Sequence, residues 1–342
     1  MIHHFNEEKW RITRIAIDSE PELVENVVTN VENPEIEYKF STALIDGIPS
    51  MPCCPQSRYE NLNQNIKYRS DDIIVCTYPK CGTTWMEQCV LLMKNGADPT
   101  FLNPADKNSY HQETGFGKFW PEAMILQDKR LDGGQFRFMT WEEFDNAPSP
   151  RVIKAHFPVN LLLGAAGKGL AGLPEGVKVV IVSRNPYDGC VSSYYHAFNP
   201  YEKGWPFDAW ATAWINGYPQ YGDYFEWVKG WYKSFQENRD RAIWIKFEDL
   251  KKDSLQELTK VANFLQIPQA NDLNFMQKVN EYSSFRSMKD QSLRKGGDKH
   301  LRKGTVGDWK NHFTPEITEI FQKRINEEFG NIPELSHQIE LE

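Results

Sequence analysis

The chain has 342 residues, a formal net charge of −8 at pH 7, and hydrophobic residues at 40% of its positions. This length and apolar content suffice for one large core, whereas the acidic balance argues against a general nucleic-acid binder, whose surface is usually basic. No apolar run approaches the roughly 18 residues that cross a bilayer, and the N-terminus lacks the basic and apolar regions of a secretory leader, so we expect a cytoplasmic protein without a membrane segment.

The cysteines and the first 66 residues carry few signals. The six cysteines form no CxxC pair, and several lie within apolar patterns, where a free thiol behaves as a small hydrophobe. This indicates a reduced intracellular protein, and no metal cluster is visible. Residues 1–66 are polar and mixed. We expect them to form an N-terminal extension that packs on a single domain of residues 67–342.

Four short apolar runs predict buried strands, at residues 73–76, 151–155, 177–182 and 242–247. Helical or loop sequence separates each run from the next, which is typical of the βαβ units of a parallel sheet. Periodicity or capping residues indicate helices between Trp85 and Asn95, at 255–265 and at 315–329. We therefore expect an α/β fold with a central, mainly parallel sheet and helices on both faces.

The segment after the first strand resembles a P-loop, the phosphate-binding turn between a strand and a helix. Its sequence is Thr77-Tyr78-Pro79-Lys80-Cys81-Gly82-Thr83-Thr84-Trp85. The first helical N–H groups and the hydroxyls of Thr83 and Thr84 can face one anion there, and Lys80 adds a positive charge. The lysine precedes the glycine, unlike in the Walker sequence GxxxxGK[ST], which disfavours an ordinary NTPase. The loop predicts a nucleotide-type ligand.

His156 follows the second strand, within Lys154-Ala155-His156-Phe157-Pro158. A neutral imidazole has a pKa near 6.5 and can accept a proton from an attacking hydroxyl at neutral pH. Ligands of parallel sheets lie at the carboxyl ends of the strands, and Lys80, His156 and Arg184 would meet there. His156 is therefore the candidate general base, with a structural histidine as the alternative.

Arg184 follows the third strand and precedes a predicted helix. Its guanidinium can bind a phosphate through two parallel hydrogen bonds, and Ser192, about two helical turns further on, can add a hydroxyl. The alternative is a structural ion pair between Arg184 and Asp188, and Asp188 could also cap the helix. The sequence leaves both arrangements open.

Residues 286–310 carry eight lysines and arginines against three aspartates. Within this basic segment, Arg302 and Lys303 stand beside Gly304, where side chains and backbone N–H groups could close over a phosphate. The other interpretation is a solvated basic loop. For a charge run taken alone, the solvated loop is the more usual outcome.

Together these segments resemble the cytosolic sulfotransferases, which use 3′-phosphoadenosine 5′-phosphosulfate (PAPS). The matching patterns are Y-P-K-x-G-T-T-W, K-T-H-x-P with alanine in place of threonine, R-N-x-x-D-x-x-V-S and R-K-G-x-x-G-D-W, in the family's order. The resemblance runs from about Asp71 to the final helix. It implies transfer of a sulfuryl group to a hydroxyl or amine of a small acceptor, with 3′-phosphoadenosine 5′-phosphate (PAP) as the product.

The resemblance also implies a role for each matching residue. The implied catalytic residues are His156 as general base, Lys80 on the leaving phosphate, Lys154 on the sulfuryl group, and Ser192, which restrains Lys80. The implied ligands of the 5′-phosphosulfate are Lys80, Cys81, Gly82, Thr83 and Thr84. The implied ligands of the 3′-phosphate are Arg184, Ser192, Arg302, Lys303 and Gly304. The implied neighbours of adenine are Trp85, Phe247, Ser283, Phe285 and Met288.

Three departures from the family's patterns modify these implications. Phe247 stands where a tyrosine is usual, which removes one hydroxyl contact to adenine worth about 0.5 to 1.5 kcal/mol. Tyr224 and Trp227 replace a tryptophan and a histidine, so the acceptor pocket can differ. Pro315 replaces valine in the KxxxTVxxxE dimer motif and removes a backbone donor, which puts a homodimer by that route in doubt.

The sequence does not identify the acceptor. Aromatic tracts at 116–120, 136–141 and 194–231 favour a largely apolar pocket for an aromatic or hydrophobic small molecule. Two alternative functions remain. A P-loop-type small-molecule phosphotransferase would use ATP with Mg²⁺, and a catalytically inactive PAP-binding protein is disfavoured by the presence of Lys80 and His156.

Overall fold

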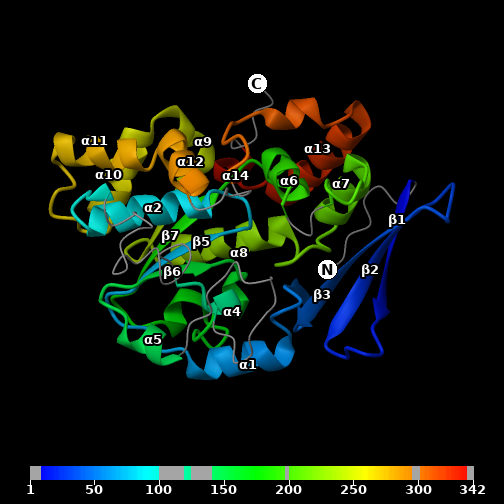
Figure 1. The fold of residues 1–342 in the computed structure, drawn as a ribbon, viewed down its shortest axis with the longest axis horizontal. Coiled ribbons are helices and arrows are strands. Elements are labelled where there is room, and N and C mark those ends of the chain that lie inside the picture. Colours follow the sequence, from blue (N-terminus) through cyan, green and yellow to red (C-terminus); the bar gives the residue numbers. More distant parts are fainter. Residues whose placement is uncertain (1–8, 100–118, 125–140, 197–199, 295–300, 337–342) are drawn as a thin grey trace.

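The computed structural model describes residues 9–99, 119–124, 141–196, 200–294 and 301–336 (Figure 1). A central sheet covered by helices makes up most of the molecule, and a smaller sheet near the N-terminus lies beside it. No helix in this described part is long and apolar enough to cross a membrane.

The central sheet consists of the four strands that the sequence predicts. They are β5 (Ile73–Thr77), β6 (Val152–Ala155), β7 (Lys178–Ser183) and β8 (Ala242–Lys246). All pairs are parallel, and the strand order is β6-β5-β7-β8. Every residue of β5 is buried, because helices cover both faces of the sheet, and this explains its continuous apolar run. The predicted α/β fold is confirmed.

Thirteen α-helices and three 3-10 helices accompany the sheets in the described residues. The α-helices are α1 (Gln56–Asn65), α2 (Thr83–Lys94), α4 (Pro121–Met124), α5 (Trp141–Asn146), α6 (Pro186–Tyr194), α7 (Phe207–Ile215), α8 (Tyr224–Glu237), α9 (Phe247–Lys252), α10 (Ser254–Phe264), α11 (Leu273–Tyr282), α12 (Phe285–Arg294), α13 (Pro315–Phe329) and α14 (Pro333–Ser336). The 3-10 helices are η2 (Val159–Leu161), η3 (Gly169–Gly172) and η4 (Asp308–Asn311).

Helix caps explain where several of these helices begin. The Asp253 carboxylate accepts the N–H of Gln256 at 3.0 Å and caps α10. Thr314 caps α13 in the same way, with Pro315 at the first helical position. For α6 the cap is Asn185, whose side-chain oxygen accepts the N–H of Tyr187 at 2.9 Å. The interpretation that Asp188 caps α6 is therefore wrong.

Alternate side chains of the central strands belong to two apolar cores on opposite faces of the sheet. Ile73 and Val75 join the core that contains α2, α10 and α11. Ile74 and Cys76 join the core that contains α6, α7, α8 and α13. This alternation is the period of two of a β-strand. Helices therefore pack on both faces of the sheet, and its polar groups lie at the ends of the strands.

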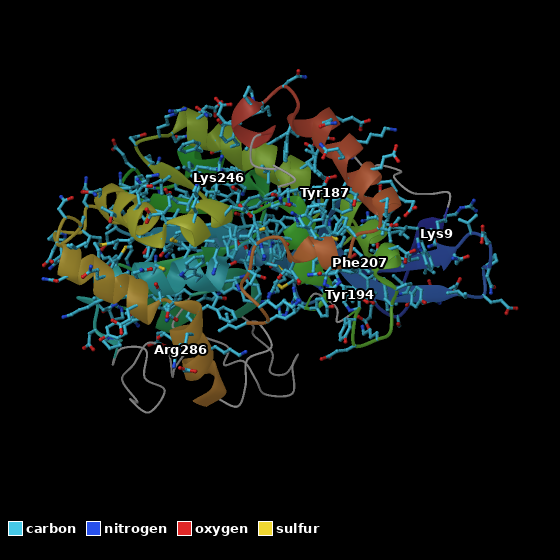
Figure 2. The ribbon with its side chains drawn as sticks, turned by 90° about the horizontal axis from the view of Figure 1, so that it is seen from above. Lys9, Tyr187, Tyr194, Phe207, Lys246 and Arg286 are labelled. Atoms are coloured by element: carbon cyan, nitrogen blue, oxygen red, sulfur yellow. The ribbon has the colours of Figure 1, made fainter. Side chains whose placement is uncertain are left out.

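Residues 10–50 form a second, antiparallel sheet for which the sequence analysis assigned no strands. It contains β1 (Trp10–Ala16), β2 (Leu23–Asn30), β3 (Glu37–Ile45) and β4 (Ile48–Ser50), paired in that order. Figure 2 shows this sheet near Lys9, well apart from Arg286 of α12. Phe40 of β3 contacts Trp205 and Trp210 of the main body, with ring centroids 5.9 and 6.1 Å apart. The small sheet thus shares a core with the large one.

Candidate active site

The structure brings Lys80, His156 and Arg184 together at the carboxyl ends of β5, β6 and β7. His156 and Arg184 each follow the last residue of their strand. Nδ1 of His156 lies 2.7 Å from the carbonyl oxygen of Thr77, the last residue of β5. Nη1 of Arg184 donates to the carbonyl oxygen of Lys80 at 3.0 Å. One polar site therefore spans three strand ends, as the sequence predicts.

The turn between β5 and α2 has a backbone that few sequences can adopt. Lys80 and Gly82 have φ angles of 69° and 103°, in the left-handed region. A Cβ on Gly82 would lie 2.9 Å from Cδ2 of Phe247. The Tyr78 hydroxyl donates to the carbonyl oxygen of Gly222 at 2.8 Å and anchors the start of the turn. The turn is therefore fixed while the first N–H groups of α2 lack partners within the helix.

The residues that follow Lys80 are positioned in different ways. The hydroxyl oxygens of Thr83 and Thr77 lie 2.6 Å apart, so a hydrogen bond ties the start of α2 to the end of β5. Cys81 is fully buried, and burial raises the pKa of its thiol to about 12. Its side chain is thus a neutral packing group, and any contact of Cys81 with an anion must come from its backbone.

Hydrogen bonding selects one tautomer of His156. Because a carbonyl oxygen only accepts, the contact with Thr77 places the proton of the neutral ring on Nδ1 and leaves the lone pair on Nε2. Burial lowers the pKa of His156 well below its usual value, and the Lys154 and Lys80 cations also lower it, against the opposing hydrogen bond to Thr77. The ring is therefore neutral at pH 7, and Nε2 can accept a proton.

Glu122 is a residue of this site that the sequence analysis missed. Its Oε1 accepts the backbone N–H groups of His156 and Phe157, at 2.8 and 3.0 Å. Its Oε2 accepts the indole N–H of Trp120 at 3.0 Å. The Nζ atom of Lys154 lies 3.6 Å from the centroid of the same indole ring. Glu122 lies in a stretch of sequence without clean periodicity, so no local signal pointed to it.

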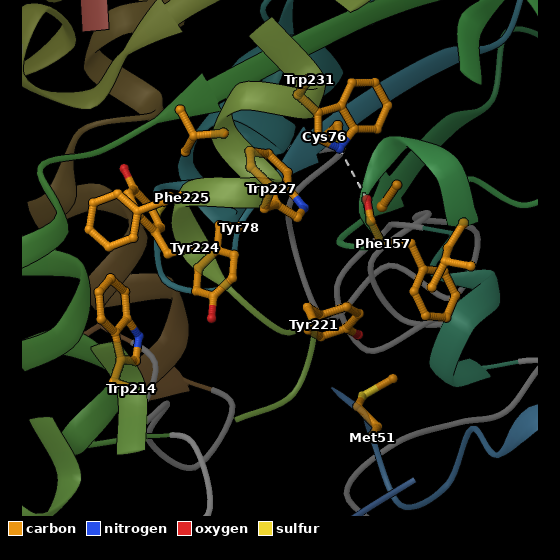
Figure 3. Packing of buried hydrophobic residues seen from close by; sticks show 14 of the residues in the cluster. Met51, Cys76, Tyr78, Phe157, Trp214, Tyr221, Tyr224, Phe225, Trp227 and Trp231 are labelled. Carbon is orange, nitrogen blue, oxygen red and sulfur yellow. Dashed lines mark hydrogen bonds between the residues drawn. The ribbon is translucent and has the colours of Figure 1, made fainter. Parts of the chain in front are cut away.

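Two indoles of α8 support the same chain segment from the core. Nε1 of Trp227 donates to the carbonyl oxygen of His156 at 2.8 Å, and Nε1 of Trp231 donates to that of Phe157 at 3.1 Å. Figure 3 shows both rings among buried aromatic residues, with a dashed line for the hydrogen bond from Trp231 to Phe157. Trp227, one of the departures from the family pattern, is thus buried and holds the main chain of the candidate base.

Arg184, just before α6, and Asp188, within α6, both bind the C-terminal segment but do not bind each other. Nη2 of Arg184 donates to the carbonyl oxygen of Thr305 at 3.1 Å, and the guanidinium lies over the Phe247 ring at 4.4 Å. The Asp188 carboxylate accepts the backbone N–H groups of Gly307 and Trp309, at 2.7 and 3.1 Å. The alternative of an Arg184–Asp188 ion pair is therefore wrong.

Arg302 and Lys303 converge on one buried carboxylate. Nη2 of Arg302 lies 2.5 Å and Nζ of Lys303 lies 2.6 Å from the two oxygens of Asp308. Although burial opposes it, hydrogen bonds from Lys303 and Arg302 hold the pKa of Asp308 well below its usual value. A Cβ on Gly304 would lie 2.4 Å from the Phe285 ring. The two cations thus occupy defined positions beside a glycine that must stay a glycine.

The residues implied for adenine lie near the starts of α2, α9 and α12. The rings of Trp85 and Phe247 meet edge to face, with centroids 5.6 Å apart. Phe285 is half-buried, whereas Ser283 and Met288 are buried in the protein. Ser192 is half-buried on α6. Residues 295–300 of the basic segment lie outside the described residues, as do the parts 116–118, 136–140 and 197–199 of the aromatic tracts.

Known proteins resemble this chain in sequence over most of its length. A family model described as "Sulfotransferase domain" matches residues 70–333. Sulfotransferase 1C2 of Oryctolagus cuniculus is 30% identical over 281 residues, which cover 77% of this chain and 86% of that protein. Sulfotransferase 2B1 of Mus musculus is 30% identical over 280 residues, which cover 77% of this chain and 73% of that protein.

Solved structures show the same fold at lower identity. Mouse sulfotransferase SULT7A1 complexed with PAP has a TM-score of 0.63 and 23% identity, and the match covers 87% of this chain and 98% of that one. Retinol dehydratase in a complex with retinol and PAP has a TM-score of 0.62 and 18% identity, with 94% and 96% covered.

Proposed function

The chain belongs to the sulfotransferase family, and on that premise we propose that it transfers a sulfuryl group from PAPS to a hydroxyl or amine of a small, largely apolar or aromatic acceptor. One observation carries the proposal. The carbonyl oxygen of Thr77 holds the ring of His156, and the hydroxyl of Thr77 contacts Thr83 at the start of α2. A single residue therefore joins the candidate base to the candidate phosphosulfate loop.

Unpaired buried donors support the fit of an anionic nucleotide to this site. Among the described residues, Nε of Arg184 and Nε1 of Trp85 are buried without a hydrogen-bond partner, which usually costs free energy. The Lys80–Gly82 turn adds a cation and backbone donors at a helix start. Lys80, Gly82, Thr83 and Thr84 would hold the 5′-phosphosulfate, and Arg184, Ser192, Arg302, Lys303 and Gly304 would hold the 3′-phosphate.

When bound, PAPS supplies an activated sulfuryl group with a phosphate leaving group. His156 Nε2 would take the proton of the acceptor while the acceptor oxygen or nitrogen forms its bond to sulfur and the bond between sulfur and the 5′-phosphate oxygen breaks, which releases PAP. Lys80 and the N–H groups of the turn stabilise the negative charge that develops on the leaving phosphate oxygen. Lys154 neutralises the sulfuryl oxygens, and Ser192 restrains Lys80 until the acceptor arrives.

The surroundings of His156 support an aromatic or apolar acceptor. The rings of Trp120 and Tyr221 flank the imidazole, with centroid distances of 5.5 and 5.2 Å. Apolar walls with few polar groups are typical of small-molecule sites. They also exclude water, which would otherwise compete with the acceptor for the sulfuryl group.

Calorimetric titration with PAP, in parallel with ATP plus Mg²⁺, tests the proposal. We expect PAP to bind and Arg302→Ala to weaken its binding by at least about 2 kcal/mol, because a charged hydrogen-bonded contact is lost. Lys323→Ala, which removes an exposed cation on α13, is the matched control and should bind PAP like the wild type.

Preference for ATP with Mg²⁺ would support a phosphotransferase instead. PAP binding without sulfuryl transfer from PAPS to any of a panel of phenols and hydrophobic alcohols would indicate an inactive PAP-binding protein.

A further inference from the structure

One side chain holds the main chain that carries the candidate base. β6 ends at Ala155, so the backbone N–H groups of His156 and Phe157 lie beyond its pairing with β5. Oε1 of Glu122 accepts both, at 2.8 and 3.0 Å. Because two hydrogen bonds converge on one buried oxygen, they fix the position of the strand end and with it that of the imidazole.

The other oxygen of the same carboxylate reaches Lys154 through an indole. Oε2 of Glu122 accepts the N–H of Trp120 at 3.0 Å, which fixes the plane of the ring. The Lys154 ammonium lies over that ring, 3.6 Å from its centroid, where the face of an indole attracts a cation. The Trp120 ring also meets His156 edge to face, at 5.5 Å and 89°. Glu122 is thus connected to Lys154 through Trp120 and to His156 through the main chain.

We propose that Glu122 is a positioning residue for sulfuryl transfer, which holds His156 through the main chain and Lys154 through Trp120. This inference rests on the proposed function, since it assigns Glu122 to the reaction of that same site. The carboxylate is buried, with 2% of Glu122 exposed. Burial raises the pKa of Glu122, whereas the hydrogen bonds from Trp120, His156 and Phe157 favour the ionised form.

Two substitutions separate the two contacts of the carboxylate. Glu122→Gln keeps one oxygen for the N–H groups of His156 and Phe157 but turns an NH₂ group toward Trp120. Only the hydrogen bond from Trp120, whose ring lies under Lys154, is then lost. Glu122→Ala removes both contacts. We expect kcat to fall about tenfold in Glu122→Gln and about a hundredfold in Glu122→Ala, because small misplacements of reacting groups have effects of that size.

The matched control is Glu257→Gln, which neutralises another buried carboxylate, 6% exposed, that pairs with Lys260 on α10, outside the site. For the Glu122 variants and the control, PAP affinity and the KM for PAPS should stay within about threefold of wild type, since no donor-binding residue changes. The acceptor is the member of the phenol and alcohol panel that the wild type sulfates fastest.

A kcat of Glu122→Gln or Glu122→Ala within threefold of wild type would overturn the inference, and so would equal losses in kcat and PAP affinity, which indicate general damage. A wild type that binds no PAP would overturn the proposed function itself, and the inference with it.

Discussion

At the scale of single residues, the environment of His156 determines how the reaction should depend on pH. The pKa of the ring is held well below its usual value by burial and by the Lys154 and Lys80 cations. The neutral, proton-accepting form therefore persists below pH 6.5, where an exposed histidine would already be half protonated. We expect kcat/KM, which reports the groups of the free enzyme, to stay constant from neutral pH to well below 6.5 before it falls.

The lowered pKa of His156 also makes the stability of the folded chain depend on pH. The pKa of His156 is lower in the folded than in the unfolded chain, so below about pH 6.5 the unfolded chain binds a proton that the folded one does not. This contribution to the free energy of unfolding is complete above that pH and declines as the pH falls toward the folded pKa. His156→Ala should remove this decline of the free energy of unfolding.

The same substitution should lower turnover by at least about a hundredfold, because it removes the candidate general base. A rate profile with its inflection at or above pH 6.5, or a variant that keeps a tenth of the activity, would refute the assignment of His156 as base.

At the scale of elements, α6 fixes the C-terminal segment that carries Arg302 and Lys303. The Asp188 carboxylate accepts the N–H groups of Gly307 and Trp309, on either side of the start of η4. Asp188→Ala would leave both N–H groups without this partner. We expect the free energy of unfolding to fall by about 2 to 3 kcal/mol, as for a hydrogen-bonded charge, and PAP affinity to fall with it because the two cations lose their support.

Chemical denaturation and PAP calorimetry measure these two effects separately. Asp188→Asn is the conservative comparison, since its one remaining carbonyl oxygen can still accept from Gly307 or Trp309. It should lie between the wild type and Asp188→Ala in both measurements. If Asp188→Ala bound PAP as tightly as the wild type, the position of Arg302 and Lys303 would not depend on α6.

The elements that the sequence predicts correctly are those whose signals are local. β5, β7 and the Lys80 turn can be recognised because burial on both faces makes the strands apolar throughout and the turn has its own residue pattern. Glu122 could not be recognised, because its partners His156 and Phe157 lie 34 and 35 residues further along the chain. The partners of Asp188 were predicted wrongly for the same reason. Its carboxylate accepts hydrogen bonds from N–H groups that lie more than a hundred positions further along the chain.

At the scale of the whole molecule, Tyr221 connects the small N-terminal sheet to the active site. The carbonyl oxygen of Pro49, in β4, accepts the backbone N–H of Tyr221 at 2.7 Å. The Tyr221 ring lies against His156, with centroids 5.2 Å apart. Burial in β2 and β3 does not alternate strictly from one residue to the next, so the period of two that marks a strand is absent and the sequence did not reveal these strands. Tertiary packing, rather than local pattern, determines this part of the fold.

Because the two sheets share one apolar core, we expect them to unfold together. Phe40 of β3 is 4% exposed and packs on Trp205 and Trp210. Phe40→Ala should lower the free energy of unfolding by about 3 to 5 kcal/mol, the usual cost of emptying a buried aromatic site. Denaturation followed by circular dichroism and by tryptophan fluorescence should give one coincident transition, displaced to lower denaturant concentration.

The matched control for this substitution is Ile15→Ala in β1. That side chain is 51% exposed, and surface truncations usually change stability by no more than about 0.5 kcal/mol. Two separate transitions in Phe40→Ala, with the later one at the wild-type midpoint, would show instead that residues 10–50 fold as an independent unit. A single shifted transition would mean that damage at Phe40 lowers the stability of the central sheet as well, and with it that of the site at its strand ends.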